Sequence, residues 1–126
     1  MIKEYTHVIF QGNNFSPNKL NTYSPQLQVK VLAEYGEIIN RGKYKNQPSP
    51  YGLATHKIEG INEQELINYI DKLINFTEYL IESGVTSIEF EINVDSQIKS
   101  SVEISSDLIN MLSYLRIKKT LTISQL

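Results

Sequence analysis

Two consecutive segments with different hydrophobic periods constrain the fold of this chain most strongly. Between Asn62 and Ser83, apolar or buried-type residues recur at helical spacing, at Leu66, Ile70, Leu73, Thr77 and Leu80. Between Ser87 and Asp95, apolar and polar residues alternate, as in a strand that buries only one face. Asn62 is a good helix N-cap, and Gly84 is a common helix stop. A helix followed directly by a one-sided strand predicts helices packed on one face of a sheet, the α+β class.

Shorter segments supply the other expected elements. We predict strands at 3–11, 26–33, 51–58 and 118–124, with a weak strand at 38–39 and a short one at 102–104. Ser16-Pro17 predicts the start of a short helix over 16–22, and Ser105 or Ser106 begins a helix that reaches about Leu115. Residues 41–50 are rich in structure breakers and predict a surface loop. The expected fold is α+β: a mainly antiparallel sheet of about five or six strands, with the two principal helices packed on one face.

Length and composition bound the class of protein. A chain of 126 residues and 14.5 kDa is long enough for one core and too short for two, so we expect a single domain over 1–126. The absence of Cys excludes disulfides and thiolate metal sites. No apolar run approaches the ~20 residues of a membrane span, so we expect no membrane association. The first five residues lack the apolar core of a secretory signal, which favours a cytoplasmic location.

Charge is strongly segregated along the chain, although the net charge is only −2. Residues 1–58 hold seven basic and three acidic side chains, whereas residues 59–107 hold eleven acidic side chains against Lys72 and Lys99. Such asymmetry bears on partners and association rates. The candidate contacts for a basic partner are Asp71, Glu78, Tyr79 and Glu82 on the outer face of the 62–83 helix, and Glu89, Glu91 and Asp95 on the polar face of the 87–95 strand. Tyr69 and Tyr79 are the candidate apolar anchors. The alternative is that these carboxylates only solvate the surface.

No motif for catalysis or cofactor binding is present. The two histidines, His7 and His56, lie in expected strands without a Gly-x-Ser-x-Gly elbow or a second metal ligand at close spacing. Phosphate-binding glycine loops are also absent. Glu89 and Glu91 share a strand face about 7 Å apart, which could suit acid–base chemistry, but a small α+β domain offers little cleft for it. We therefore expect no catalytic, cofactor-binding or metal-binding residues, and a small hydrolase using His7 or His56 is the enzyme alternative.

The loop after residue 40 contains three basic residues, Arg41, Lys43 and Lys45, with Tyr44 between the two lysines. The basic side chains could contact phosphate, and the tyrosine ring could stack on a base. Three positive charges in a loop are more typical of solubility than of recognition. We therefore expect no nucleic-acid partner.

Three stretches together resemble a known bacterial family. They are Phe10-Gln-Gly-Asn-Asn-Phe-Ser-Pro17, then Arg41-Gly-Lys-Tyr with Tyr51-Gly-Leu-Ala-Thr-His, and finally the run from Val102 to Ile123. In this order they resemble the opening turn, the Lys-Gly loop with its following strand, and the strand–helix–strand ending of the domain of unknown function family 4279. The resemblance covers roughly residues 5–25 and 41–126. It implies a small cytosolic bacterial domain, of the kind used as immunity proteins beside secreted toxins.

These observations predict a non-catalytic protein-binding module. The specific expectation is an immunity protein of a contact-dependent or polymorphic toxin–antitoxin system. It would occlude a basic toxin domain, such as a nuclease, through an acidic surface. An orphan regulatory or ligand-binding domain with merely solvated acidic faces is the alternative.

Overall fold

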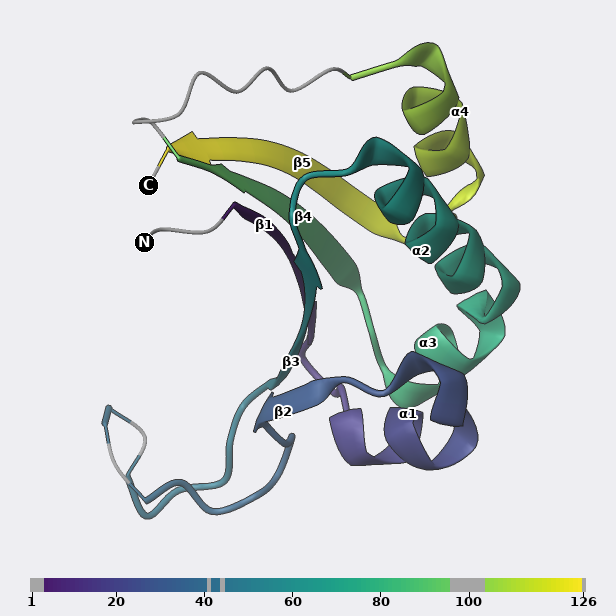
Figure 1. The fold of residues 1–126 in the computed structure, drawn as a ribbon. Coiled ribbons are helices and arrows are strands. Elements are labelled where there is room, and N and C mark those ends of the chain that lie inside the picture. Colours follow the sequence, from purple (N-terminus) through teal and green to yellow (C-terminus); the bar gives the residue numbers. More distant parts are fainter. Residues whose placement is uncertain (1–3, 41, 44, 96–103, 126) are drawn as a thin grey trace.

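The computed structural model describes residues 4–40, 42–43, 45–95 and 104–125, and it forms one sheet covered by helices (Figure 1). The strands are β1 (Tyr5–Gly12), β2 (Lys30–Ala33), β3 (Gly52–Glu59), β4 (Ser87–Val94) and β5 (Lys118–Gln125). The α-helices are α1 (Pro17–Tyr23), α2 (Glu63–Asn75), α3 (Thr77–Ser83) and α4 (Ser106–Tyr114), and a 3-10 helix, η1, spans Pro25–Leu27. The α+β class is confirmed, with a mixed, mostly antiparallel sheet of five strands.

The strand order in the sheet is β2-β3-β1-β4-β5. β1 lies at the centre and pairs antiparallel with both β3 and β4, while β2 pairs antiparallel with β3. This is the connectivity of the β-α-β-β-α-β motif. The remaining unit, α4 followed by β5, adds an edge strand parallel to β4. A parallel neighbour requires a crossover connection, and α4 lies in that connection.

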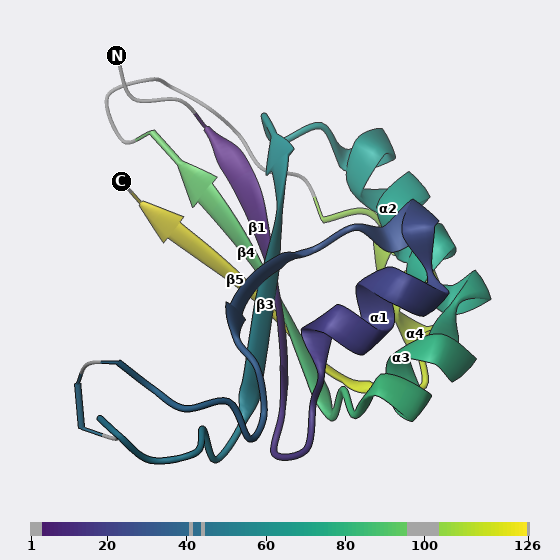
Figure 2. The same cartoon turned by 90° about the horizontal axis from the view of Figure 1, so that it is seen from below.

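All four α-helices lie on the same face of the sheet, and the opposite face carries no helix in the described part of the chain (Figure 2). The core fills the space between the two layers. Val8 and Phe10 of β1 and Ile88, Phe90 and Ile92 of β4 point into it and are at most 3% exposed. The helices contribute Leu66, Ile70, Leu73, Leu80 and Leu108, which are equally buried. The alternation expected over 87–95 is confirmed from Ser87 to Ile92, where its apolar side packs against the helices, but it is wrong at Asn93 and Asp95, which are buried.

Three glycines close one end of the core around the backbone of Phe15. A Cβ atom added to Gly52 would lie 1.9 Å from the Phe15 carbonyl oxygen, and one added to Gly12 would lie 2.0 Å from the carbonyl oxygen of Gly84. Gly84 itself has φ of 101° and ends α3 in the left-handed conformation. The Ser16 N–H donates to the Ser83 carbonyl at 2.8 Å, which ties the start of α1 to the end of α3. The role of the glycine-containing turn after β1 is therefore to let these backbone segments pack directly against one another.

The single helix expected over 62–83 is wrong, because the chain breaks it at Phe76 into α2 and α3. The cause is Thr77, whose buried hydroxyl donates to the carbonyls of Leu73 and Ile74 at 3.1 and 2.7 Å. A threonine that bonds back to the preceding turn competes with the helical N–H groups and bends a helix. The N-cap prediction is confirmed, since the Asn62 side chain accepts from the Glu65 N–H.

The strand expected over 26–33 is shorter than predicted. Pro25–Leu27 forms the 3-10 helix η1, and only Lys30–Ala33 pairs with β3. Between them, the amide side chain of Asn21 bonds both the N–H and the carbonyl of Val29, so Val29 does not join the ladder. Val31, in the part that does pair with β3, is 36% exposed.

The remaining short strands are also revised. The weak strand at 38–39 amounts to two isolated bridges, Ile38 with Pro48 and Ile39 with Lys45, inside the long connection from β2 to β3. Most of the short strand expected at 102–104 lies outside the described residues. The expected helix start at Ser105 is confirmed, because its hydroxyl accepts from the Leu108 N–H at 3.2 Å.

Candidate functional site

The residues proposed as partner contacts do not form one surface. Asp71 lies on α2, and Glu78, Tyr79 and Glu82 lie on α3, all exposed in the helix layer. Glu89 and Glu91 lie on β4 and point to the opposite, helix-free face of the sheet. The structure therefore separates two candidate surfaces that sequence spacing could not tell apart: the helix layer and the open sheet face.

Two of the predicted contacts are buried and cannot serve as surface contacts. Asp95 is only 4% exposed, and its backbone N–H donates to the Glu4 carboxylate at 3.1 Å. Tyr69 is 8% exposed and stacks on His56 with ring centroids 4.5 Å apart. Both expectations are corrected, because Asp95 follows a strand end that is buried on both faces and Tyr69 belongs to the core side of α2.

Charge distinguishes the two surfaces. The four α-helices carry six acidic residues (Glu63, Glu65, Asp71, Glu78, Glu82, Asp107) and two basic ones (Lys19, Lys72). The five strands carry three acidic residues (Glu59, Glu89, Glu91) and four basic ones (Lys30, Lys57, Lys118, Lys119). The helix layer is therefore the acidic side of the molecule, and the sheet is close to neutral.

Exposed apolar side chains accompany the carboxylates on α3. Tyr79 and Ile81 are 40% and 48% exposed, and they lie between Glu78 and Glu82 in the sequence of the helix. The Tyr79 ring also packs against Phe76, with centroids 5.9 Å apart, which supports it from the core side. Glu78 pairs with Arg116, but both side chains are mostly exposed, so water screens the pair.

The open sheet face holds Glu89 and Glu91 in a row of mixed groups. Glu89 lies opposite Ile9 and accepts from the Thr122 hydroxyl at 3.4 Å, while Glu91 lies opposite His7. Among the described residues, no ion pair or hydrogen bond joins Lys118 or Lys119 of the neighbouring strand to these carboxylates. Lys118 pairs in register with Ser87, and Lys119 points to the other face, where its Nζ donates to the Leu115 carbonyl at 2.7 Å.

The two histidines lie on opposite faces of the sheet. His7 belongs to the open face, and His56 faces the helices, where it lines a cavity of about 260 Å³ with Glu65, Asn68, Tyr69 and Lys72. Burial lowers the pKa of His56 below its ordinary value, and the nearby Lys72 ammonium lowers it further. Burial also raises the pKa of Tyr69. The described lining holds a histidine and an acid but no serine or threonine, so it lacks the nucleophile of a hydrolytic triad.

The described ranges 4–40, 42–43, 45–95 and 104–125 contain no group of three or more His, Cys, Asp or Glu that could hold a metal ion. Within the same residues, no helix combines the length and the apolar character needed to cross a membrane. Of the basic loop, Arg41 and Tyr44 lie outside the described residues.

Sequence reasoning missed a second feature, a cavity between β2 and the connection that follows it, lined in part by Leu32, Ile38 and Glu37. The available signal was the pair Ile38-Ile39 directly before a breaker-rich loop. Comparison of the chain with family models, curated proteins and solved structures finds no match.

Proposed function

We propose that this chain is a non-catalytic protein-binding module that docks onto a basic partner protein through its helix layer. The supporting observation is the excess of acidic over basic residues in the four α-helices, six against two, together with two exposed apolar side chains on α3. Asp71 and Glu82 make no ion pair or hydrogen bond through their side chains within the described part of the chain. Tyr79 and Ile81 lie among these charges and are about half exposed. Apolar anchors surrounded by polar groups are typical of protein interfaces.

The partner that fits this surface best is a toxin domain with a phosphate-binding, and therefore basic, active site. A nuclease has such a site because it must hold the phosphates of its substrate. Carboxylates of the helix layer would take the place of those phosphates, and Tyr79 would be buried at the contact. The proposed role is that of an immunity protein that neutralises its toxin by occlusion. The resemblance of three stretches of the sequence to the domain of unknown function family 4279 implies the same role, but no family model matches the chain.

The test is growth rescue by co-expression with a toxin-type reading frame adjacent to this gene. The wild-type chain should restore growth and should co-purify with the toxin domain in a one-to-one complex. The variant Asp71→Lys/Glu82→Lys should lose protection, because it places positive charge against a basic partner. The matched control Glu89→Lys/Glu91→Lys changes the charge by the same amount on the open sheet face and should protect as the wild type does.

Three results would overturn this proposal. Full protection by Asp71→Lys/Glu82→Lys, with its folding confirmed by circular dichroism, would exclude the helix layer as the binding surface. Absence of both rescue and complex formation would favour the alternative of an orphan regulatory or ligand-binding domain. A hydrolase activity of the purified chain that is lost in His7→Ala or His56→Ala would instead support the enzyme alternative.

A further inference from the structure

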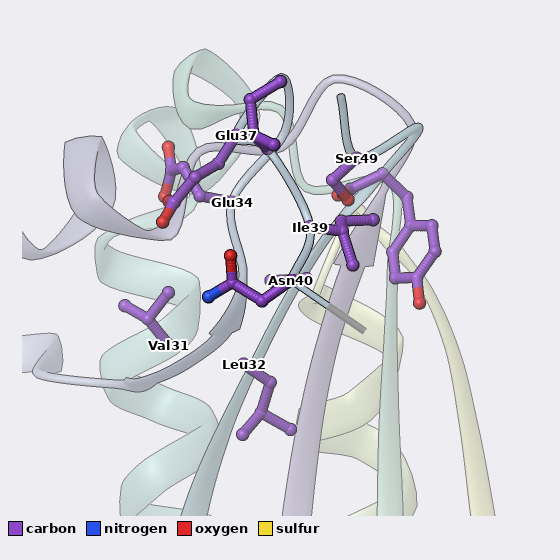
Figure 3. A pocket seen from close by; sticks show the side chains of 10 residues that line it. Val31, Leu32, Glu34, Glu37, Ile39, Asn40 and Ser49 are labelled. Atoms are coloured by element: carbon purple, nitrogen blue, oxygen red, sulfur yellow. The ribbon is translucent and has the colours of Figure 1, made fainter. Parts of the chain in front are cut away.

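A cavity of about 420 Å³ lies at the edge of the sheet, between β2 and the first part of the β2–β3 connection (Figure 3). The connection is held in place by its own backbone hydrogen bonds. The Gly36 N–H donates to the Ser49 carbonyl at 3.0 Å, the Ser49 N–H donates to the Glu37 carbonyl at 2.8 Å, and the Ile39 N–H donates to the Gln47 carbonyl at 3.0 Å. The cavity therefore has two ordered walls, and its size falls within the range of ligand sites in proteins.

The apolar part of the lining is unusually exposed. Leu32 and Ile38 are 51% and 57% exposed, and Val31 is 36% exposed. Leu32 has no partner residue in β3, because the register shifts between Val31 and Ala33. Its side chain is therefore not fixed by the ladder or the core. Covering such aliphatic groups on binding would be favourable by roughly 25 cal/mol for each Å² removed from water.

Among the described residues, the charged part of the lining is acidic: Glu34 and Glu37 line the cavity, and no described lysine or arginine does. Figure 3 shows the two glutamates near one end and Leu32 near the other. Glu34 is already engaged, since its carboxylate accepts from the Ser16 hydroxyl and from the Asn18 N–H. The carboxylate of Glu37 has no hydrogen-bond or ion-pair partner among the described residues, and it is exposed.

A neutral polar group completes the lining. Asn40 is exposed and lies between Leu32 and the two glutamates (Figure 3), and its side-chain amide makes no hydrogen bond within the described part of the chain. A side-chain amide both donates and accepts, so it can pair with the N–H and carbonyl groups of a peptide backbone. Because Leu32 and Ile38 are half exposed, the ligand that covers them must extend beyond the cavity.

We propose that this cavity binds an extended peptide segment of a partner protein, with an aliphatic side chain against Leu32 and Ile38 and a neighbouring Lys or Arg at Glu37. The aliphatic group matches the exposed apolar lining, the basic residue matches a carboxylate that has no partner among the described residues, and the peptide backbone matches Asn40. The site lies on β2 and its following connection, so it does not rest on the helix layer proposed above.

The experiment is selection of random peptides displayed on phage against the full-length protein. The enriched peptides are then synthesised, and their dissociation constants are measured with the wild type and three variants. The enriched sequences should share an aliphatic residue next to Lys or Arg. Ile38→Asp should weaken their binding at least tenfold. Glu37→Gln should weaken it several-fold at low salt and by less than twofold in 0.5 M salt, because salt screens the ion pair.

The control is Ile123→Asp, which makes the same change at a similarly exposed isoleucine on β5, at the opposite edge of the sheet, and should leave peptide binding unchanged. Ile38 is more than half exposed, so its substitution should not unfold the protein, and a thermal unfolding curve checks this. As a second readout, an enriched peptide should shift the amide resonances of Leu32, Ile38 and Asn40 in a ¹⁵N spectrum. The proposal is overturned if no shared motif is enriched, if Ile38→Asp binds the peptides as the wild type does, or if the shifts map to other elements.

Discussion

Among the glycines around Phe15, Gly52 lets the sheet and the helix layer approach each other closely, because it has no side chain. Gly52 lies on β3 and approaches the Phe15 backbone so closely that no Cβ fits between them. The atoms in the way are the carbonyl oxygen and carbon of Phe15, which cannot turn aside as a flexible side chain can. The distance between the sheet and the start of α1 therefore depends on this residue.

Gly52→Ala should lower the free energy of unfolding by about 2–3 kcal/mol, since it overpacks a site closed by backbone atoms. The matched control is Gly60→Ala, where φ is 77° but no atom lies within 4 Å of the added Cβ. That change should cost only about 1 kcal/mol, from the left-handed conformation alone. Chemical denaturation of both variants measures the difference. Equal losses would show that packing at Gly52 is not the constraint.

The pKa of His56 makes the stability of the protein depend on pH. Its folded-state pKa lies below the ordinary 6.5, because of burial first and the Lys72 charge second. Between that lowered pKa and 6.5, the unfolded chain binds more protons than the folded chain does. The His56 contribution is therefore complete above about pH 6.5 and declines as the pH falls below that value.

His56→Gln should reduce the loss of unfolding free energy between pH 7.5 and pH 5.5, even if it lowers stability at every pH by removing the stack on Tyr69. Denaturant titrations at four pH values in this window measure the slope. The control variant is His7→Gln, on the open face of the sheet. It should keep the part of the pH dependence of unfolding free energy that His56 causes. An unchanged slope in His56→Gln would contradict the assignment.

At the scale of elements, Thr77 divides one predicted helix into two. Thr77→Val keeps the volume but removes the hydroxyl that bonds the carbonyls of Leu73 and Ile74. It should lower the free energy of unfolding by about 1 kcal/mol, because the bonds lie in a buried site. Thr22→Val removes a similar bond to the Asn18 carbonyl at an exposed position, and it should cost less than about 0.5 kcal/mol. Denaturant midpoints of the two variants test this difference.

Elements with an uninterrupted period could be predicted from the sequence, and those shaped by side-chain hydrogen bonds could not. The 87–95 alternation located β4 to within a residue, and Ser16-Pro17 located α1. Thr77 occupies an apolar position of the helical pattern. The hydrogen bonds from its hydroxyl to the preceding turn therefore do not change the spacing of apolar residues in the sequence. Similarly, the Asn21 side chain bonds the backbone of Val29, eight residues later in the chain, and so keeps Val29 out of β2. The alternation of apolar and polar residues does not indicate such a bond.

At the scale of the whole molecule, the sequence located the acidic residues but not the surface they form. Glu82 and Glu89 are seven residues apart, yet the chain turns at Gly84 and places them on opposite sides of the sheet. Asp95 continues the polar alternation of β4 but is buried beside Glu4, a contact across 91 residues. Which carboxylates act together depends on the topology. Among the described helices and strands, the helices carry a net negative charge beside exposed apolar groups, whereas the strands are close to neutral.

This concentration of charge should control how fast the partner binds. The Debye length is about 10 Å at 0.1 M salt and about 3 Å at 1 M, so steering by helix-layer carboxylates acts at low salt. With the co-purified toxin domain, Asp71→Lys/Glu82→Lys should lower the association rate constant about tenfold at 0.05 M salt and less than twofold at 0.5 M. Glu89→Lys/Glu91→Lys should change it less than twofold at either salt concentration, because the open sheet face lies on the far side of the molecule (Figure 2). Stopped-flow mixing measures both rates, and equal effects of the two double variants would mean that net charge, rather than the helix layer, steers the encounter.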